Sequence, residues 1–182
     1  MAQEYVLIKN NVKILRKLTE KRKLDRSCSS VEESLPPFLR AVLLADGTVT
    51  SLISAFMGEE IDVLTVEQSF IKMPEELSFL ELEKDANAFV RKVNLIGRTT
   101  NKQYAYAESL LNPAFIEEDL FRALTNEGVG MGAVLRNKAQ GSYREIINID
   151  DTSTKIAERT YAVYLNGRPC ILITEAFTID NF

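Results

Sequence analysis

The chain has 182 residues, of which 46% are hydrophobic and 26% are charged, and its formal net charge is −4. These values suit one domain with a sizeable core, which we expect to span residues 1–182. The sequence has no histidine, which excludes Ser-His-Asp and Cys-His nucleophiles and histidine metal sites. Any chemistry must therefore use carboxylates, arginines and backbone amides.

The N-terminal segment is expected to be helical. Residues 4–24 carry apolar side chains at irregular helical spacing, which predicts one or two helical segments. The basic stretch at 16–26 is interrupted by acidic residues, so we interpret it as the polar end of a helix rather than as a nucleic-acid surface. Neither a signal peptide nor a membrane span is expected. Cys28 and Cys170 form no disulfide framework, and a reduced cytoplasm is the simpler setting.

Two short helices are predicted next. A proline pair at 36–37 opens the first of them, because proline is tolerated in a first helical turn. The second runs over Val49–Phe56, is capped by Thr48 or Thr50, and is closed by Gly58. Together they predict a pair of α-helices joined by a tight turn.

The pattern then changes from helical to extended. Residues 61–73 are β-branched and alternate in polarity, which predicts a strand. Residues 85–96 and 103–111 read as a hairpin around the polar turn at 97–102. A helix is expected from Asn112-Pro113 to Gly128.

The glycine-rich segment Gly128–Gly132 is interpreted as a helix stop and a turn. A strand before it and a Gly-Lys-Ser/Thr after it are both missing, which argues against a Walker-type NTPase. The alternative is a flexible stretch that brings backbone amides up to an anion.

The C-terminal part is predicted to be a strand followed by a hairpin. Tyr143–Ile149 is the strand, and Arg159–Leu165 and Arg168–Phe177 flank Asn166-Gly167, the dipeptide typical of a type I′ turn. Helices come first and hairpins follow, with one inserted helix. This order predicts an α+β fold with a mostly antiparallel sheet.

The expected domain thus divides into a helical part at about 1–58 and a sheet-forming part at about 59–182.

Two charged residues stand out in the second part, because each shares its side-chain direction with the apolar residues of its strand: Glu175 with Ile171, Ile173 and Phe177, and Arg91 with Phe89, Val93 and Leu95. A charge on such a face must be paired, neutralised or in use. Two interpretations are open. Arg91 and Glu175 form a structural ion pair, or Arg91 receives a ligand carboxylate in a bidentate fork.

The neighbours of Glu175 depend on the register of the hairpin. A plain two-residue turn places Glu158 directly opposite Glu175, which would raise the pKa of one carboxyl and suit it to act as a general acid. A bulge near Arg159 would undo this register. Arg159 itself is expected to form a salt bridge from the other sheet face to a neighbouring helix, and Arg144 is expected to be an edge or surface partner.

These residues resemble the chorismate lyase (chorismate pyruvate-lyase) family. The resemblance extends from about Leu35 to Phe177, and the final hairpin is its most specific part. The matching segments are 89–95, 129–132, 143–146 and 166–177.

The resemblance implies an antiparallel sheet with helical flaps that enclose an internal ligand. The family's carboxylate-binding arginine falls on Arg91, its essential glutamate on Glu175, and the pair whose backbone amide helps to hold the carboxylate on Met131-Gly132. The implied reaction removes pyruvate from chorismate and leaves 4-hydroxybenzoate, with Glu175 as the acid.

The implied partner is a small-molecule substrate, chorismate or a related aromatic carboxylate. No cofactor, metal, nucleic acid, membrane or obligate protein partner is implied. The segment 105–109 and Glu158 depart from the family's pattern close to the site, which leaves the exact substrate open. The same fold also occurs in effector-binding domains of bacterial transcription regulators, so the alternative is a non-catalytic domain that binds a small carboxylate.

Overall fold

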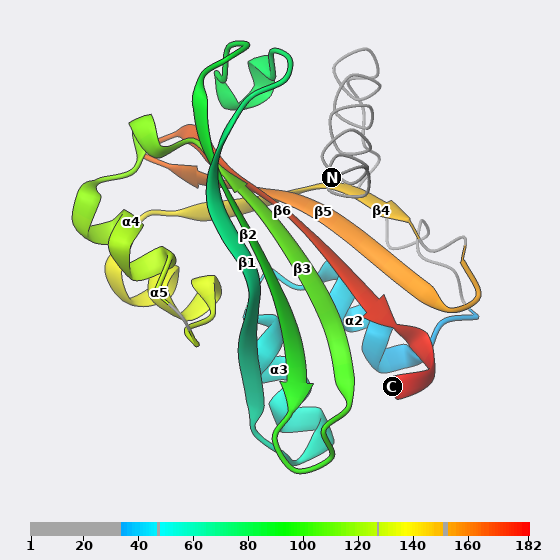
Figure 1. Ribbon diagram of the computed structural model, residues 1–182. Helices are drawn as coiled ribbons and strands as arrows, with labels where there is room; N and C mark the ends of the chain where they lie inside the picture. The colour runs from blue at the N-terminus through cyan, green and yellow to red at the C-terminus, as the bar shows by residue number, and fades with distance from the viewer. Residues whose placement is uncertain (1–33, 47, 127, 151–152) are drawn as a thin grey trace.

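A six-stranded antiparallel sheet forms the centre of the computed structural model, which describes residues 34–46, 48–126, 128–150 and 153–182. The strand order is β1-β2-β3-β6-β5-β4 (Figure 1). The strands are β1 Ile61–Lys72, β2 Asn87–Gly97, β3 Gln103–Leu111, β4 Tyr143–Asp150, β5 Ile156–Leu165 and β6 Arg168–Thr178. The expected α+β fold is confirmed. The predictions for residues 4–24, the basic stretch at 16–26 and Cys28 lie outside the described residues.

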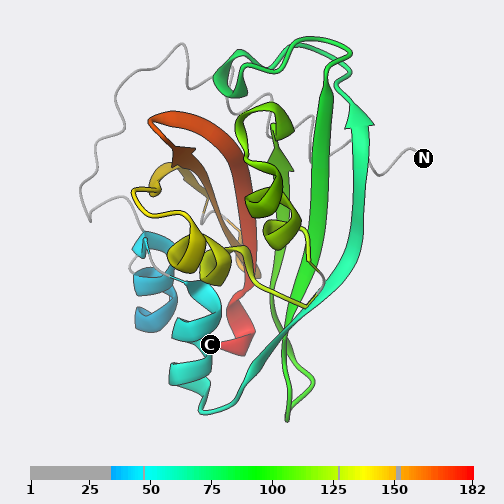
Figure 2. The ribbon, with the colours of Figure 1, turned by 90° about the vertical axis from the view of Figure 1, so that its left-hand side faces the viewer.

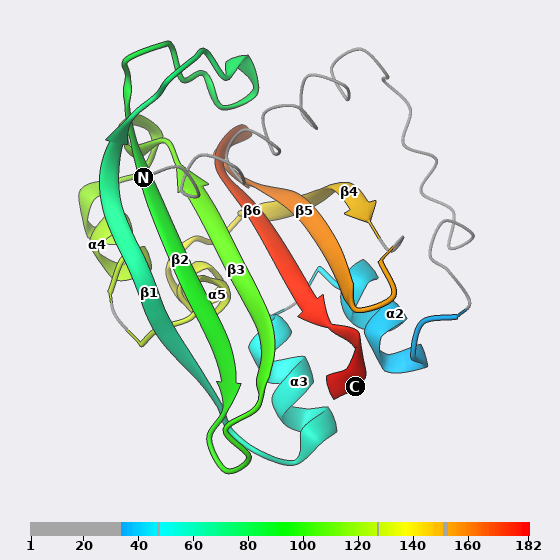
Figure 3. The same cartoon turned by 45° about the vertical axis from the view of Figure 1, so that its right-hand side comes forward.

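In the part of the chain that the structure describes, four α-helices are found. They lie on one face of the sheet, here called the inner face (Figure 2). Figure 3 shows the opposite, outer face, with β1, β2 and β3 in front of α4 and α5. The helices are α2 Pro37–Leu44, α3 Val49–Met57, α4 Glu118–Leu124 and α5 Met131–Lys138, and the short 3₁₀ turns are η2 Ser78–Leu80, η3 Pro113–Phe115 and η4 Ile179–Asn181. Within the described ranges, no helix is long and apolar enough to cross a membrane.

The end of α3 and the turn of the final hairpin confirm two turns predicted from the sequence, whereas the predicted threonine cap at the start of α3 forms no side-chain hydrogen bond. Gly58 ends α3 in the left-handed conformation, with φ 70°, which a glycine adopts without strain. Asn166 and Gly167 both have positive φ, 51° and 78°, as a type I′ turn requires. The register of this hairpin shifts at Val163/Tyr164, however, and the shift changes the site.

Two predictions for residues 112–138 were wrong. The single helix expected after Asn112 is broken, because Ile116 is extended and buried between η3 and α4. The segment after Gly130 continues as the helix α5, with Met131, Val134 and Leu135 buried. These three residues have the i, i+3, i+4 spacing of an amphipathic helix.

The inner face carries two separate apolar clusters. One lies under α2 and α3, around Leu39, Leu43 and Phe177, and the other lies under α4 and α5, around Leu111 and Leu135. The outer face has its own cluster, in which the β1–β2 connection packs on the sheet. The two inner clusters leave room between them for polar side chains, and this is where the candidate site lies.

Candidate active site

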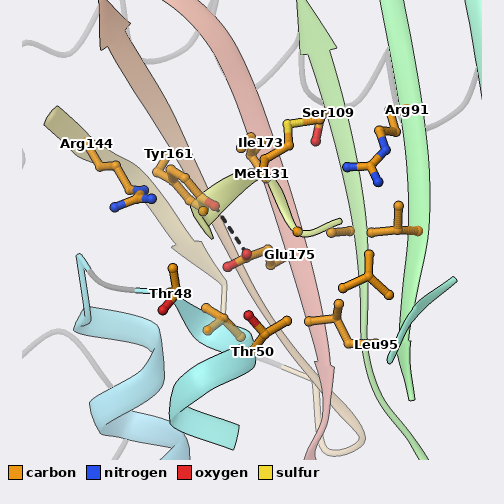
Figure 4. A pocket seen from close by; sticks show the side chains of 16 residues that line it. Thr48, Thr50, Arg91, Leu95, Ser109, Met131, Arg144, Tyr161, Ile173 and Glu175 are labelled. Carbon is orange, nitrogen blue, oxygen red and sulfur yellow. Dashed lines mark hydrogen bonds between the residues drawn. The ribbon is translucent and has the colours of Figure 1, made fainter. Parts of the chain in front are cut away.

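A pocket lies between the inner face of the sheet and the first turns of α3 and α5 (Figure 4). Five strands, β2 to β6, supply charged or polar side chains to it. Its lining residues are Thr48, Val49, Thr50, Val63, Arg91, Val93, Leu95, Ala107, Ser109, Gly130, Met131, Gly132, Arg144, Tyr161, Ile173 and Glu175. The pocket therefore contains Arg91, Met131, Gly132 and Glu175, the four positions predicted to bind substrate. It also contains Arg144, which was expected at an edge or on the surface.

Arg91 on β2 is buried, with 2% of its surface exposed. Its Nη2 donates hydrogen bonds to the carbonyl oxygens of Val129, at 2.9 Å, and Asn126, at 3.3 Å. Burial lowers the pKa of its guanidinium. Within the described ranges it has no carboxylate partner, and its buried Nε has no hydrogen-bond partner. The structural Arg91–Glu175 ion pair is thus absent there, and an arginine so placed can receive a ligand carboxylate.

Glu175 on β6 has another arginine as its partner. Arg159, on β5 directly opposite, donates from Nε to Glu175 Oε2 at 2.7 Å, and Tyr161 Oη donates to Oε1 at 3.2 Å. The Nη1 of Arg159 also donates to the carbonyl oxygens of Val42 and Ala45, where α2 ends, at 2.6 and 2.5 Å. Free carbonyls at a helix C-terminus attract a cation. Arg159 therefore joins the carboxylate in the pocket to the end of α2.

The predicted pairing of Glu158 with Glu175 is wrong. The register shift at Val163/Tyr164 moves every later pair by one residue, so Glu158 faces Ala176 and Arg159 faces Glu175. A one-residue shift also exchanges the two faces of a strand. The pKa of Glu158 is raised by burial and by Asp150, its neighbour on β4. This carboxyl does not line the pocket.

Two helices begin at the pocket wall. The first-turn amides of a helix have no partner within it, and neither Thr48, before α3, nor Gly130, before α5, caps its helix with a side chain. A Cβ at Gly132 would lie 2.7 Å from Thr48 Cγ2, so an alanine there would displace the Thr48 side chain and disturb the close packing of the two helix starts. The sequence reading identified the Met131 amide but missed the first turn of α3.

Tyr161 was also missed as a site residue. It lies on β5 two residues after Arg159, and residues two apart in a strand point to the same face of the sheet. This shared face was the available signal. Burial and the neighbouring Glu175 raise the pKa of its hydroxyl far above the usual value, so it acts as a hydrogen-bond donor at neutral pH. Among the described residues, no group of three or more His, Cys, Asp or Glu side chains is placed to hold a metal ion.

A family model described as Chorismate pyruvate-lyase Rv2949c-like matches residues 43–182, and this range contains every charged residue of the pocket. The chain belongs to this family. A curated relative of this chain, from Mycobacterium leprae (strain TN), is named Chorismate pyruvate-lyase. It is 23% identical over 177 residues, which cover 90% of this chain and 79% of the relative. The resemblance stated from the sequence is thereby confirmed.

Two solved structures resemble this chain in fold at low sequence identity. The crystal structure of PhnF from Mycobacterium smegmatis matches with a TM-score of 0.56 and 15% identity, over 75% of this chain and 66% of that chain. The effector domain of the same PhnF matches with a TM-score of 0.54 and 15% identity, over 74% and 90% of the two chains. At this identity the likeness establishes a shared fold and leaves activity open.

Proposed function

We propose that this protein is a cofactor-independent lyase that removes pyruvate from chorismate and leaves 4-hydroxybenzoate. The observation that carries the proposal is the pocket itself. In a chain of the chorismate pyruvate-lyase family, it holds a buried carboxylate, Glu175, and a buried arginine, Arg91, that has no carboxylate partner among the described residues. An aromatic carboxylate bound by Arg91 would extend across the pocket toward Glu175.

Arg91 is the group proposed to hold the ring carboxylate. Its Nε is buried in the described structure without an acceptor, and its Nη2 is oriented by two backbone carbonyls. A fixed guanidinium can form two parallel hydrogen bonds with a carboxylate. The Met131 amide, at the positive end of α5, is proposed to add a backbone donor to the same anion.

Glu175 is the group proposed to move the proton. Arg159 and Tyr161 both donate hydrogen bonds to its side chain, an arrangement that suits a carboxylate. We therefore assign Glu175 the role of base first and of acid second. The carboxylate takes the proton from the ring carbon that bears the hydroxyl. The electrons of that C–H bond complete the aromatic ring while the C–O bond to the enolpyruvyl group breaks. Glu175 then returns the proton to the methylene carbon of enolpyruvate, which gives pyruvate.

Formation of the aromatic ring makes the elimination thermodynamically favourable. The protein therefore mainly has to orient the substrate and stabilise the charge that develops. Holding the substrate in a reactive geometry and placing donors where charge develops account for large rate accelerations in enzymes. Arg159 and Tyr161 hold Glu175 in place, and the apolar clusters on either side of the pocket limit access of water.

The second candidate is a non-catalytic domain that binds a small carboxylate. The fold shared with the PhnF effector domain supports it. Such a domain would use Arg91 to bind its ligand and would not convert it. The two functions differ in a single measurable outcome, the release of pyruvate.

In the deciding experiment, the purified protein is incubated with chorismate, and pyruvate and 4-hydroxybenzoate are measured. We expect the two products to form in equal amounts. Glu175→Gln should lower turnover by roughly 10²–10⁴-fold, the range for removal of an acid–base group. Its affinity for 4-hydroxybenzoate should remain, because the amide has nearly the same shape. Glu118→Gln, at an exposed position on α4, is the matched control and should behave as wild type. No pyruvate from the wild-type protein, with 4-hydroxybenzoate still bound, would favour the binding domain.

A further inference from the structure

The pocket contains a second arginine that the proposed function has not used. Arg91 and Arg144 lie on opposite sides of Glu175 (Figure 4). Arg91 comes from β2 in one half of the sheet, and Arg144 comes from the edge strand β4 in the other. A ligand with a single carboxylate can engage only one of them while its ring lies beside Glu175.

Arg144 donates a hydrogen bond to one backbone carbonyl at the pocket's edge. It is half-buried on β4, opposite Val163. Its Nη1 donates to the carbonyl oxygen of Asp46 at 2.5 Å, and its Nη2 lies 3.5 Å from where a Cβ on Gly132 would stand. Within the described ranges it forms no ion pair. This hydrogen bond orients the guanidinium, and no carboxylate of the described residues neutralises its positive charge.

The surroundings of Arg144 add to the positive potential at this end of the pocket. The first turn of α3, Thr48 to Thr50, lines the same end without a side-chain cap. A helix start of this kind favours an anion nearby. Tyr161 stands between Arg144 and Glu175 (Figure 4), and its hydroxyl is committed to Glu175. The charge of Arg144 is thus available to a ligand.

We propose that Arg144 binds a second carboxylate of the substrate, so that the pocket selects a dicarboxylate with one acid group at each end. This inference rests on the proposed function and assigns Arg144 to the carboxylate of the enolpyruvyl group. Arg144 then holds the part of the substrate that leaves, and Arg91 holds the part that becomes 4-hydroxybenzoate. The product has lost the second carboxylate, so Arg144 contributes to binding of the substrate and not of the aromatic product.

The test uses two stable probes of nearly equal size. The first is the dicarboxylate 3-(carboxymethoxy)benzoate, and the second is its side-chain amide, 3-(carbamoylmethoxy)benzoate, which keeps only the ring carboxylate. Calorimetry measures both against wild type, Arg144→Gln, Arg144→Lys and the exposed control Arg122→Gln. Arg144→Gln should weaken the dicarboxylate by about 10–100-fold, the usual range for loss of a charged hydrogen bond. The amide probe and 4-hydroxybenzoate should change less than about 2-fold. Arg144→Lys should retain part of the preference for the dicarboxylate probe over the amide probe, and Arg122→Gln should retain all of it.

Turnover separates this inference from the proposed function. If wild type releases pyruvate from chorismate, Arg144→Gln should raise KM by a similar factor with 4-hydroxybenzoate affinity unchanged. An unchanged KM would overturn the role of Arg144 and leave the lyase intact. If wild type releases no pyruvate but Arg144→Gln still abolishes the preference for the dicarboxylate probe, the lyase fails and the dicarboxylate site stands. Equal loss of both probes in a variant with wild-type melting temperature would overturn the inference.

Discussion

The two halves of the sheet treat buried charge in different ways. In the β4–β6 half, Arg159 and Glu175 neutralise each other at 2.7 Å, and carbonyl oxygens at the end of α2 complete the arginine's contacts. In the β1–β3 half, Arg91 and Glu108 are both buried, and neither has a charged hydrogen-bond partner among the described residues. They lie on neighbouring strands but on opposite faces, since Arg91 faces Ser109 and Glu108 faces Lys92 in the register. They cannot neutralise each other.

This difference separates a charge that holds the fold from one that is available to a ligand. A buried pair is costly to break, because the remaining partner is left charged in an apolar setting. An unpaired guanidinium held by carbonyls already carries part of the desolvation cost of binding, so it is preorganised for an anion. Stability experiments should therefore respond most to the β4–β6 half, and binding experiments to Arg91.

The largest expected effect on stability is that of Arg159→Met. The substitution leaves Glu175 buried without its arginine and should lower the free energy of unfolding by about 3–5 kcal/mol, measured by urea denaturation. The double variant Arg159→Met/Glu175→Gln should recover a large part of this loss, because no buried charge then remains unpaired. Strictly additive losses in the single and double variants would show that the two side chains do not act as a pair.

Arg91→Ala should affect binding more than stability. We expect the affinity for 4-hydroxybenzoate to fall by about 2–5 kcal/mol, the scale for loss of one partner of a buried charged contact. Arg91→Lys should recover only part of it, because an ammonium lacks the planar fork. Calorimetric titration measures both variants. Wild-type affinity in Arg91→Ala would mean that the anion is bound elsewhere in the pocket.

The smallest effect is expected at Glu108 and depends on pH. Burial raises the pKa of its carboxyl, Lys92 opposes the shift and Glu67 adds to it. The folded protein thus prefers the protonated form of Glu108. The contribution of this carboxyl to stability is therefore complete below the ordinary pKa of a glutamate and is lost as the pH rises through its raised pKa in the folded protein. Glu108→Gln should therefore raise the melting temperature at neutral pH and match wild type in acid. If the difference in melting temperature between Glu108→Gln and wild type widened as the pH fell, the pKa of Glu108 would be lowered in the folded protein, contrary to this prediction.

Much of this arrangement could be predicted from alternation along single strands. Arg91 and Glu175 stood out because each shares a face with apolar residues, and the structure places both in one pocket. Asn166-Gly167 predicted the hairpin turn correctly. These signals are local, since the direction of a side chain depends on its position in its own strand.

The partners of these residues could not be predicted in the same way. The register shift at Val163/Tyr164 places Arg159 instead of Glu158 opposite Glu175. Its one signal in the sequence is Pro169, which pairs with Tyr164 at the shift, because a proline inside a strand often marks a bulge. The contact of Arg159 with the end of α2 depends on packing between segments more than 100 residues apart. The helix α5 was hidden by the glycines before it, although its buried residues have helical spacing.

Gly132 shows how the two helix starts depend on each other. Its Cα lies so close to Thr48 that an added methyl group would meet Cγ2 at 2.7 Å. The side chains at positions 48 and 132 therefore compete for the same space, although 83 residues separate them in the chain. Over evolutionary time neither position can enlarge alone. A relative with alanine at the second position would need a smaller side chain at the first, so the two sites are expected to covary inversely in size.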